Sequence, residues 1–150
     1  MKILAAGCLH GDSKLVERLA KKAEKENVEL VILCGDFTEE EKTEGIIGPF
    51  VKANKKVLMV PGNHESLATA DFLAELYGVM NIHGYSVKYK DIGFFGCSAA
   101  NIGLHQLTEE EILGLLRKGF SNIKDLKKKM RSSSRISSNT AKCFASDSRT

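Results

Sequence analysis

Three short apolar runs, each leading into a polar turn that contains glycine, are the feature that most constrains the fold of this chain. The runs lie at 2–8, 29–34 and 56–60, and each has the length of a strand that is buried on both faces. The third run stops at Pro61 and Gly62, which end a strand and expose the side chains that follow. Because segments with helical spacing separate the runs, the pattern predicts repeated β-loop-α units.

Helix-start signals follow each of these runs. Asp12 or Ser13 can cap a helix after the first run, and Ser66 can cap one after the third. After the second run, Thr38 and Glu41 form a capping box, and glycines interrupt the helix that it predicts. The inward residues predicted for the helix after Ser66 are Leu67, Ala70, Leu73 and Tyr77.

The pattern changes in the second half of the chain. Runs at 85–89 and 92–97 flank a two-residue turn and predict adjacent antiparallel strands. A polar loop over 98–105 follows, and Thr108 then opens a second capping box and a helix. We therefore expect an α/β fold, in which parallel βα units form a mixed sheet with the helices outside.

Five side chains of metal-ligand type fall at three equivalent strand ends: Cys8 and His10, then Asp36, then Asn63 and His64. Strand-helix-strand units are parallel and right-handed, so these ends share one edge of the sheet. Open α/β sheets bind their ligands at that edge. Asp36 offers two oxygens and can bridge two cations, Asn63 offers a neutral amide oxygen, and His64 need not bind metal.

Each of these residues also has a purely structural interpretation. His10 can be a surface histidine, Asp36 can cap a helix beside Thr38, and the stretch 62–65 can be a polar turn. Taken singly, the structural and functional interpretations are about equal. Turn chemistry seldom produces five such residues at three successive strand ends, so the combination favours a metal site.

The composition is that of one soluble globular domain. The 150 residues are 43% hydrophobic and 27% charged, which suits a single core. No apolar run approaches the roughly 20 residues of a membrane span, and the chain begins in a strand rather than a signal peptide. The four cysteines show no CxxC spacing. We expect a cytoplasmic location, where disulfides are rare.

The net charge of +3 is unevenly distributed along the chain. Residues 1–116 carry 12 Lys and Arg against 17 Asp and Glu, whereas residues 117–150 carry 10 against 2. The basic character thus belongs to the end segment, which lacks interleaved aromatic residues. Nucleic-acid binding is therefore not favoured.

The motifs Leu9-His10-Gly11-Asp12, Gly35-Asp36 and Gly62-Asn63-His64-Glu65 resemble the first three signatures of the calcineurin-like metallophosphoesterases, spaced as in their small prokaryotic members. The resemblance covers about residues 1–129. It implies an α-β-β-α sandwich with two divalent metal ions, which bind a phosphate ester and supply hydroxide for in-line attack. By resemblance, phosphodiesterase activity is favoured over phosphatase activity.

The resemblance also implies a role for each site residue. Asp36 would bridge the two metals, His10 would serve the first and Asn63 the second. His64 would lie over the phosphate as a general acid or transition-state donor. Glu65 would orient His64 without binding metal itself. The implied cofactors are Mn, Zn or Fe, and the implied partner is a small phosphate ester or a nucleotide.

The chain departs from the family pattern in two ways. The first signature is normally Asp-x-His, and Cys8 stands at the aspartate position. A thiolate suits zinc or iron but not magnesium or calcium, so we expect an altered metal preference and a weakened first site. The family also has a later strand that ends in histidine and a Gly-His-x-His segment. Neither is found, since His83 and His105 come too early, so we expect one bound ion or none.

The segment after residue 129 differs from the rest. Periodicity stops, and 7 of the 21 residues from 130 to 150 are serine, which predicts disorder. A family strand should begin there, so we hypothesise that the chain leaves its ancestral reading frame near the run 127–129. A gene without a family-like downstream frame would rule this out. We thus expect an incomplete domain over 1–129, a disordered or out-of-frame tail over 130–150, and self-association through uncovered sheet surface.

Three functions are compatible with the sequence. The first is a metal-dependent phosphoesterase, impaired in this chain, with Ser98 and Asn101 as candidate pocket contacts. The second is a non-catalytic scaffold or binding protein of the same fold. The third and least favoured is a nucleic-acid-binding module that uses the basic tail. Metal content separates the first two, and salt-dependent DNA binding that is lost with the tail would support the third.

Overall fold

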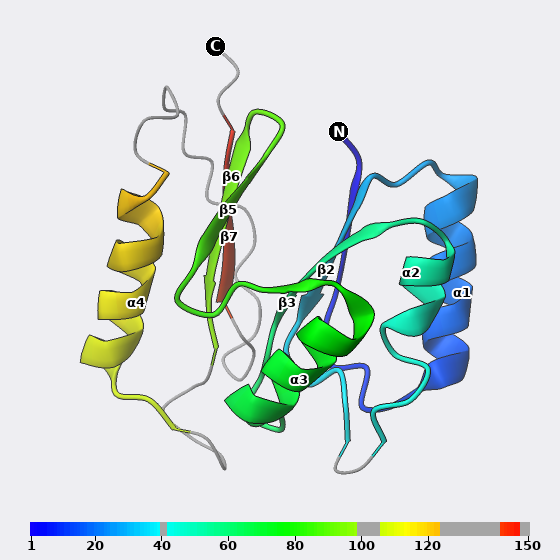
Figure 1. Cartoon of the computed structure of the whole chain (residues 1–150), viewed down its shortest axis with the longest axis horizontal. Coiled ribbons are helices and arrows are strands. Elements are labelled where there is room, and N and C mark those ends of the chain that lie inside the picture. Colours follow the sequence, from blue (N-terminus) through cyan, green and yellow to red (C-terminus); the bar gives the residue numbers. More distant parts are fainter. Residues whose placement is uncertain (40–41, 99–105, 124–141, 148–150) are drawn as a thin grey trace.

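The computed structural model describes residues 1–39, 42–98, 106–123 and 142–147, and these are arranged in four layers, α-β-β-α (Figure 1). The first sheet is parallel, in the order β1 (Ile3–Ala6), β2 (Leu30–Cys34), β3 (Lys56–Val60) and β4 (Met80–Asn81). The second is antiparallel, in the order β5 (Ser86–Tyr89), β6 (Ile92–Cys97) and β7 (Lys142–Asp147).

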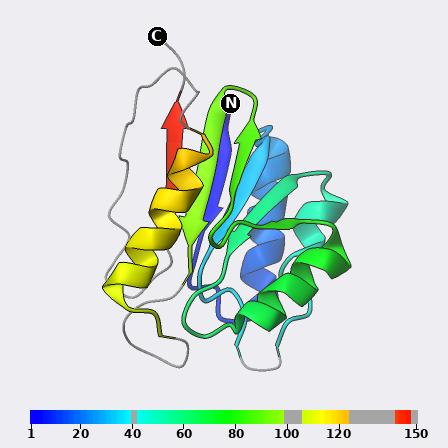
Figure 2. The same cartoon turned by 60° about the vertical axis from the view of Figure 1, so that its left-hand side comes forward.

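The helices cover the two outer faces of this sandwich. The first sheet is covered by α1 (Ser13–Lys25), α2 (Gly48–Lys52) and α3 (Leu67–Tyr77). On the opposite side, α4 (Glu109–Ser121) packs against the second sheet, as the turned view makes clear (Figure 2). None of the helices in the described ranges is both long and apolar enough to span a bilayer.

Successive residues of β2 and β3 point to opposite faces of the sheet and so belong to two separate hydrophobic cores. On β2, Val31 and Leu33 pack toward the helices, whereas Leu30 and Ile32 pack toward the second sheet and Phe94 of β6. Burial on both faces explains why the runs that form β2 and β3 are continuously apolar rather than alternating. The first run is not buried in this way, since Ile3 and Ala5 of β1 are exposed. The predicted strands are confirmed, with bounds close to those expected.

Three predicted helix caps are confirmed. The Asp12 carboxylate accepts a hydrogen bond from the Leu15 N–H, and the Ser66 hydroxyl accepts one from the Thr69 N–H. Thr108 and Glu111 form a complete capping box. Each bond satisfies an N–H group that the first helical turn leaves without a partner.

The capping box predicted after the second strand is wrong. No helix begins at Thr38; instead Glu39 and Lys42 form an isolated antiparallel bridge, and the next helix is the short α2. Both the N–H and the hydroxyl of Thr38 donate to the buried carboxylate of Glu65, which holds Thr38 in the loop after β2. Tertiary contact thus overrides the local signal.

Two further expectations need correction. The parallel and antiparallel strands lie in two facing sheets rather than in one mixed sheet. Leu67 is exposed instead of facing inward, because it occupies the first position of α3, just beyond its cap. The two-residue strand β4 was not predicted, since a pair of residues carries no periodicity.

The expectation that the segment after residue 130 lacks packed secondary structure is wrong for Lys142–Asp147. These residues form β7 and pair with the whole of β6, from Ile92 opposite Asp147 to Cys97 opposite Lys142. Strand pairing uses backbone N–H and C=O groups, which every non-proline residue carries, so it needs no periodic side-chain pattern. Residues 130–141 and 148–150 lie outside the described ranges.

The predicted uncovered sheet surface is found on β1. Ile3 and Ala5 pair with Leu30 and Ile32 and so share the face that looks toward the second sheet. Ile3 is nevertheless 38% exposed, and Ala5 is exposed as well. The described residues therefore leave this edge of the space between the sheets open, and self-association through it stays a prediction.

Candidate metal centre

Hydrogen bonds between backbones join the loops that follow β1 and β2. The Cys8 N–H donates to the Gly35 carbonyl at 3.0 Å, and the His10 N–H donates to the Asp36 carbonyl at 2.9 Å. These bonds continue the pairing of the two strands beyond their ends. The separation of the side chains that the two loops carry is therefore set by the sheet.

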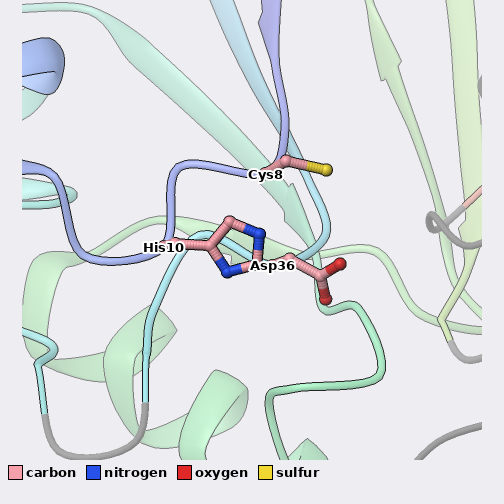
Figure 3. Close-up of side chains that lie close together, drawn as sticks. All are labelled: Cys8, His10 and Asp36. Carbon is pink, nitrogen blue, oxygen red and sulfur yellow. The ribbon is translucent and has the colours of Figure 1, made fainter.

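Cys8, His10 and Asp36 converge on one point at this edge (Figure 3). Each offers one ligand atom, and these atoms lie within 4.8 Å of one another. Bonds from zinc to sulfur, nitrogen and oxygen are about 2.0 to 2.3 Å, so two ligands of one ion lie at most about 4.5 Å apart. A small side-chain rotation suffices to close the difference. The donor set of sulfur, nitrogen and oxygen therefore fits one divalent ion of the zinc or iron type.

All three of these residues have a left-handed backbone conformation. Their φ angles are 54° for Cys8, 45° for His10 and 49° for Asp36. This region is uncommon for residues other than glycine, and such conformations persist where the surrounding structure enforces them. The hydrogen bonds between the two loops provide that enforcement. Strained backbone at all three candidate ligands is typical of a functional site.

The loop after β3 supplies a further pair of contacts to this group. The His64 N–H donates to Asp36 Oδ1 at 3.3 Å, and the His64 ring lies edge-on to the His10 ring, with centroids 5.3 Å apart. A methyl group at Gly62 would overlap the Asp36 carboxylate, so only glycine fits there. Asn63 is half-buried between Gly62 and His64, and its role as a ligand stays a prediction.

Glu65 does not orient His64 through the hydrogen bonds that the structure describes. Its carboxylate is 2% exposed and accepts hydrogen bonds from the backbone N–H groups of Asp36, Thr38 and Gly62 and from the Thr38 hydroxyl. The expectation that Glu65 orients His64 stays a prediction. The sequence shows an acidic residue next to the motif, but not that it is buried.

The group opens to solvent on one side. Asp36 is 5% exposed, whereas Cys8, His10 and His64 are exposed. A carboxylate held in the protein interior, with a thiol and an imidazole at its solvent side, leaves room for water or a ligand to approach. Asn101 and His105 lie outside the described residues, so the predicted pocket contact of Asn101 stays untested.

His83 has a structural role at the other end of this sheet edge. It follows β4, is half-buried, and its Nδ1 accepts a hydrogen bond from the Ser98 N–H at 2.8 Å. Burial lowers the pKa of the imidazole from its usual 6.5, and the nearby Asp71 carboxylate partly opposes this. The neutral ring therefore anchors the end of β6 to the first sheet. Ser98 is buried there, and its predicted contact with a substrate stays untested.

Protonation of His83 should make the protein less stable in mild acid. Because the pKa is lower in the folded state, the unfolded chain binds more protons as the pH falls below about 6.5. The stabilising contribution of neutral His83 is complete above that pH and is lost as the pH falls through the folded pKa. Urea unfolding between pH 5 and 7 should show a smaller pH slope for His83→Gln than for the wild type. Equal slopes would contradict this assignment.

The α-β-β-α fold thus carries a group of candidate metal ligands at the strand ends of its first sheet. The chain matches the calcineurin-like phosphoesterase family over residues 1–133 and belongs to that family. Members of this family are phosphoesterases that use divalent metal ions.

One solved structure is similar to this chain. It is the crystal structure of TT1561 of Thermus thermophilus, with a TM-score of 0.67 and 16% sequence identity. The match covers 82% of this chain and 63% of TT1561, so this chain spans less than two thirds of that protein. At this identity the likeness concerns the fold alone. No curated protein matches the chain.

Proposed function

We propose that this chain binds one divalent metal ion through Cys8, His10 and Asp36 and hydrolyses phosphate esters slowly. Phosphodiesters, in a small molecule or a nucleotide, are the proposed substrates. The observation that carries the proposal is the convergence of three ligand atoms within 4.8 Å, on residues with strained backbone, at the edge where such sheets bind ligands.

A divalent ion at this place would neutralise phosphate charge and lower the pKa of water. Asp36 is suited to hold it, because the His64 N–H fixes its buried carboxylate at Oδ1, and one carboxylate oxygen lies within 4.8 Å of the ligand atoms of Cys8 and His10. The exposed imidazole of His64 lies beside His10 and is the proposed proton donor to the leaving group. The amide oxygen of Asn63 is the proposed further ligand, on the side of β3.

Low efficiency follows from the ligand set. The family uses two metals, and this chain has four histidines, of which His83 is engaged with Ser98. Cys8 replaces a carboxylate. Mutation of residues that only hydrogen-bond to metal ligands lowers metal affinity roughly 10–100-fold, so the loss of the ligands themselves should lower it further. Clamping of both the attacking and leaving oxygens by two ions would then fail. An out-of-frame origin of the segment after residue 129, and a cytoplasmic location, remain part of this proposal.

A non-catalytic binding role for the same fold is the second candidate. It is favoured by the outer face of α3, where Phe72 and Leu76 are 61% and 60% exposed, one helical turn apart. Exposed apolar side chains that lie together suit contact with another protein. In this case the chain would lack turnover whatever metal is supplied.

Hydrolysis of bis-p-nitrophenyl phosphate tests the proposed function. With zinc, manganese or iron added, the 150-residue chain should show weak turnover or none. A version in which the two histidine-bearing family segments follow residue 129 should be active, because each metal then regains an imidazole. Asp36→Asn in that version should abolish turnover. Release of p-nitrophenol measures all three rates.

Two results would contradict the proposal. Robust turnover by the 150-residue chain that depends on Asp36 would mean that missing ligands arrive from elsewhere, such as a partner subunit. An inactive extended chain that binds metal normally would favour the non-catalytic role.

A further inference from the structure

We infer that Glu65 is a positioning residue, which holds Asp36 in the conformation that metal binding requires. The inference rests on the proposed metal site and deepens it. Among the described residues, the hydrogen bonds of Glu65 go to backbone groups and to the Thr38 hydroxyl rather than to a proposed metal-binding side chain. Glu65 acts on the Asp36 backbone, whose N–H donates to Glu65 Oε2 at 3.0 Å.

The two carboxylate oxygens of Glu65 join the loop after β2 to the loop after β3. Oε2 accepts hydrogen bonds from the Asp36 N–H and from the Gly62 N–H, the latter at 2.7 Å. Oε1 accepts hydrogen bonds from the N–H of Thr38, at 2.9 Å, and from its hydroxyl, at 3.0 Å. One side chain thus fixes the distance between the strand end that carries Asp36 and the strand end that carries His64.

The burial of Glu65 makes this arrangement rigid. The residue is 2% exposed, and a carboxylate out of water is tolerated only where hydrogen-bond donors replace its hydration. Each of the four donors gains from the ionised acceptor, because charge-assisted hydrogen bonds are shorter and stronger than neutral ones. Movement of either loop would break these bonds at a place that solvent scarcely reaches.

The conformation of Asp36 depends on this anchor. Asp36 has a φ of 49°, which a residue with a side chain adopts at a cost, so its surroundings must hold it there. Its carbonyl is held by the His10 N–H, its Oδ1 by the His64 N–H, and its own N–H by Glu65. Without Glu65 the backbone can relax, and the carboxylate would then turn away from Cys8 and His10.

Cobalt binding by Glu65→Gln tests the inference without any measurement of activity. Glutamine has the same shape, but its amide NH2 must face one of the two pairs of donors, so at least one backbone N–H group loses its acceptor. The dissociation constant for Co²⁺, titrated by visible absorption, should rise about 10–100-fold, the effect typical of residues behind metal ligands. Val57→Ala is the matched control, because Val57 is buried at the opposite end of β3. It should lower thermal stability but leave the cobalt affinity unchanged.

A second measurement uses the wild-type protein, in case Glu65→Gln does not fold. If Glu65 favours metal binding by fixing the two loops, bound metal must in turn stabilise those loops. Zinc should therefore slow hydrogen exchange of the Asp36 and Gly62 N–H groups at least about tenfold more than that of the Val57 N–H.

The outcomes separate this inference from the proposed function. Cobalt affinity lowered equally in Glu65→Gln and Val57→Ala, or unchanged in both, would overturn the positioning role and leave the metal site intact. Unchanged exchange of the Asp36 and Gly62 amides on zinc binding would do the same. If the wild type binds neither cobalt nor zinc, the proposed metal site fails, and the positioning role fails with it.

Discussion

Replacement of Cys8 by aspartate should change which metal this protein prefers. The dissociation constant for Mn²⁺ divided by that for Zn²⁺ should fall by at least about 100-fold. Mutation of residues that only hydrogen-bond to metal ligands changes affinity roughly 10–100-fold, and replacement of a ligand itself should have a larger effect. A thiolate is a soft ligand that suits zinc, whereas a carboxylate suits manganese and magnesium. Aspartate at this position also matches the usual first signature of the family. Competition titrations with a metal indicator measure both constants.

The control for this experiment is Cys34→Ala. Cys34 ends the neighbouring strand β2 and is buried between the two sheets. Its replacement removes a thiol that does not belong to the group of Cys8, His10 and Asp36. It should leave the metal preference as it is in the wild type. A preference that is the same in the wild type and in Cys8→Asp would mean that Cys8 does not bind the metal.

Replacement of Gly62 by alanine should both destabilise the protein and impair metal binding. The added methyl group would overlap the Asp36 carboxylate and crowd its backbone nitrogen, which donates to Glu65. Such overpacking costs about 1–3 kcal/mol, because neighbouring groups must move. Here the group that must move is the proposed central ligand. Urea unfolding should show the loss of stability, and cobalt titration should show the loss of affinity.

Gly114→Ala is the matched control for this change. Gly114 lies within α4, and a methyl group there would have nothing within 4 Å. Alanine in a helix interior is favoured over glycine by about 0.5–1 kcal/mol, so this variant should be slightly more stable than the wild type. Similar effects of the two substitutions would show that Asp36 is not confined as the structure indicates.

The strands and helix caps of the first half could be predicted because they depend on short stretches of chain. The run 29–34 is almost entirely apolar because β2 is buried on both faces. Asp12 and Ser66 were recognisable as helix caps because each is a residue type that favours the position just before a helix. The meeting of Cys8, His10 and Asp36 at one edge followed from the handedness of βα connections. These features required no knowledge of contacts between distant residues.

Other features were decided by contacts between residues far apart in the sequence. Glu65 accepts hydrogen bonds from the backbone of Asp36, 29 residues earlier, and from the N–H and hydroxyl of Thr38, where a helix cap was predicted. The strand β7 pairs with β6 through backbone groups that are the same for nearly every residue type, so its side chains do not reveal it.

The sequence alone therefore determined which residue types stand at the strand ends, and with them the chemistry that this protein can support. Only the tertiary structure decided how the candidate ligands are held. Their left-handed backbone, the space that Gly62 leaves for Asp36, and the buried carboxylate of Glu65 all arise where separate loops pack together. The physical reason is that a hydrogen bond or a steric overlap between loops depends on positions in space, and local sequence patterns do not specify these.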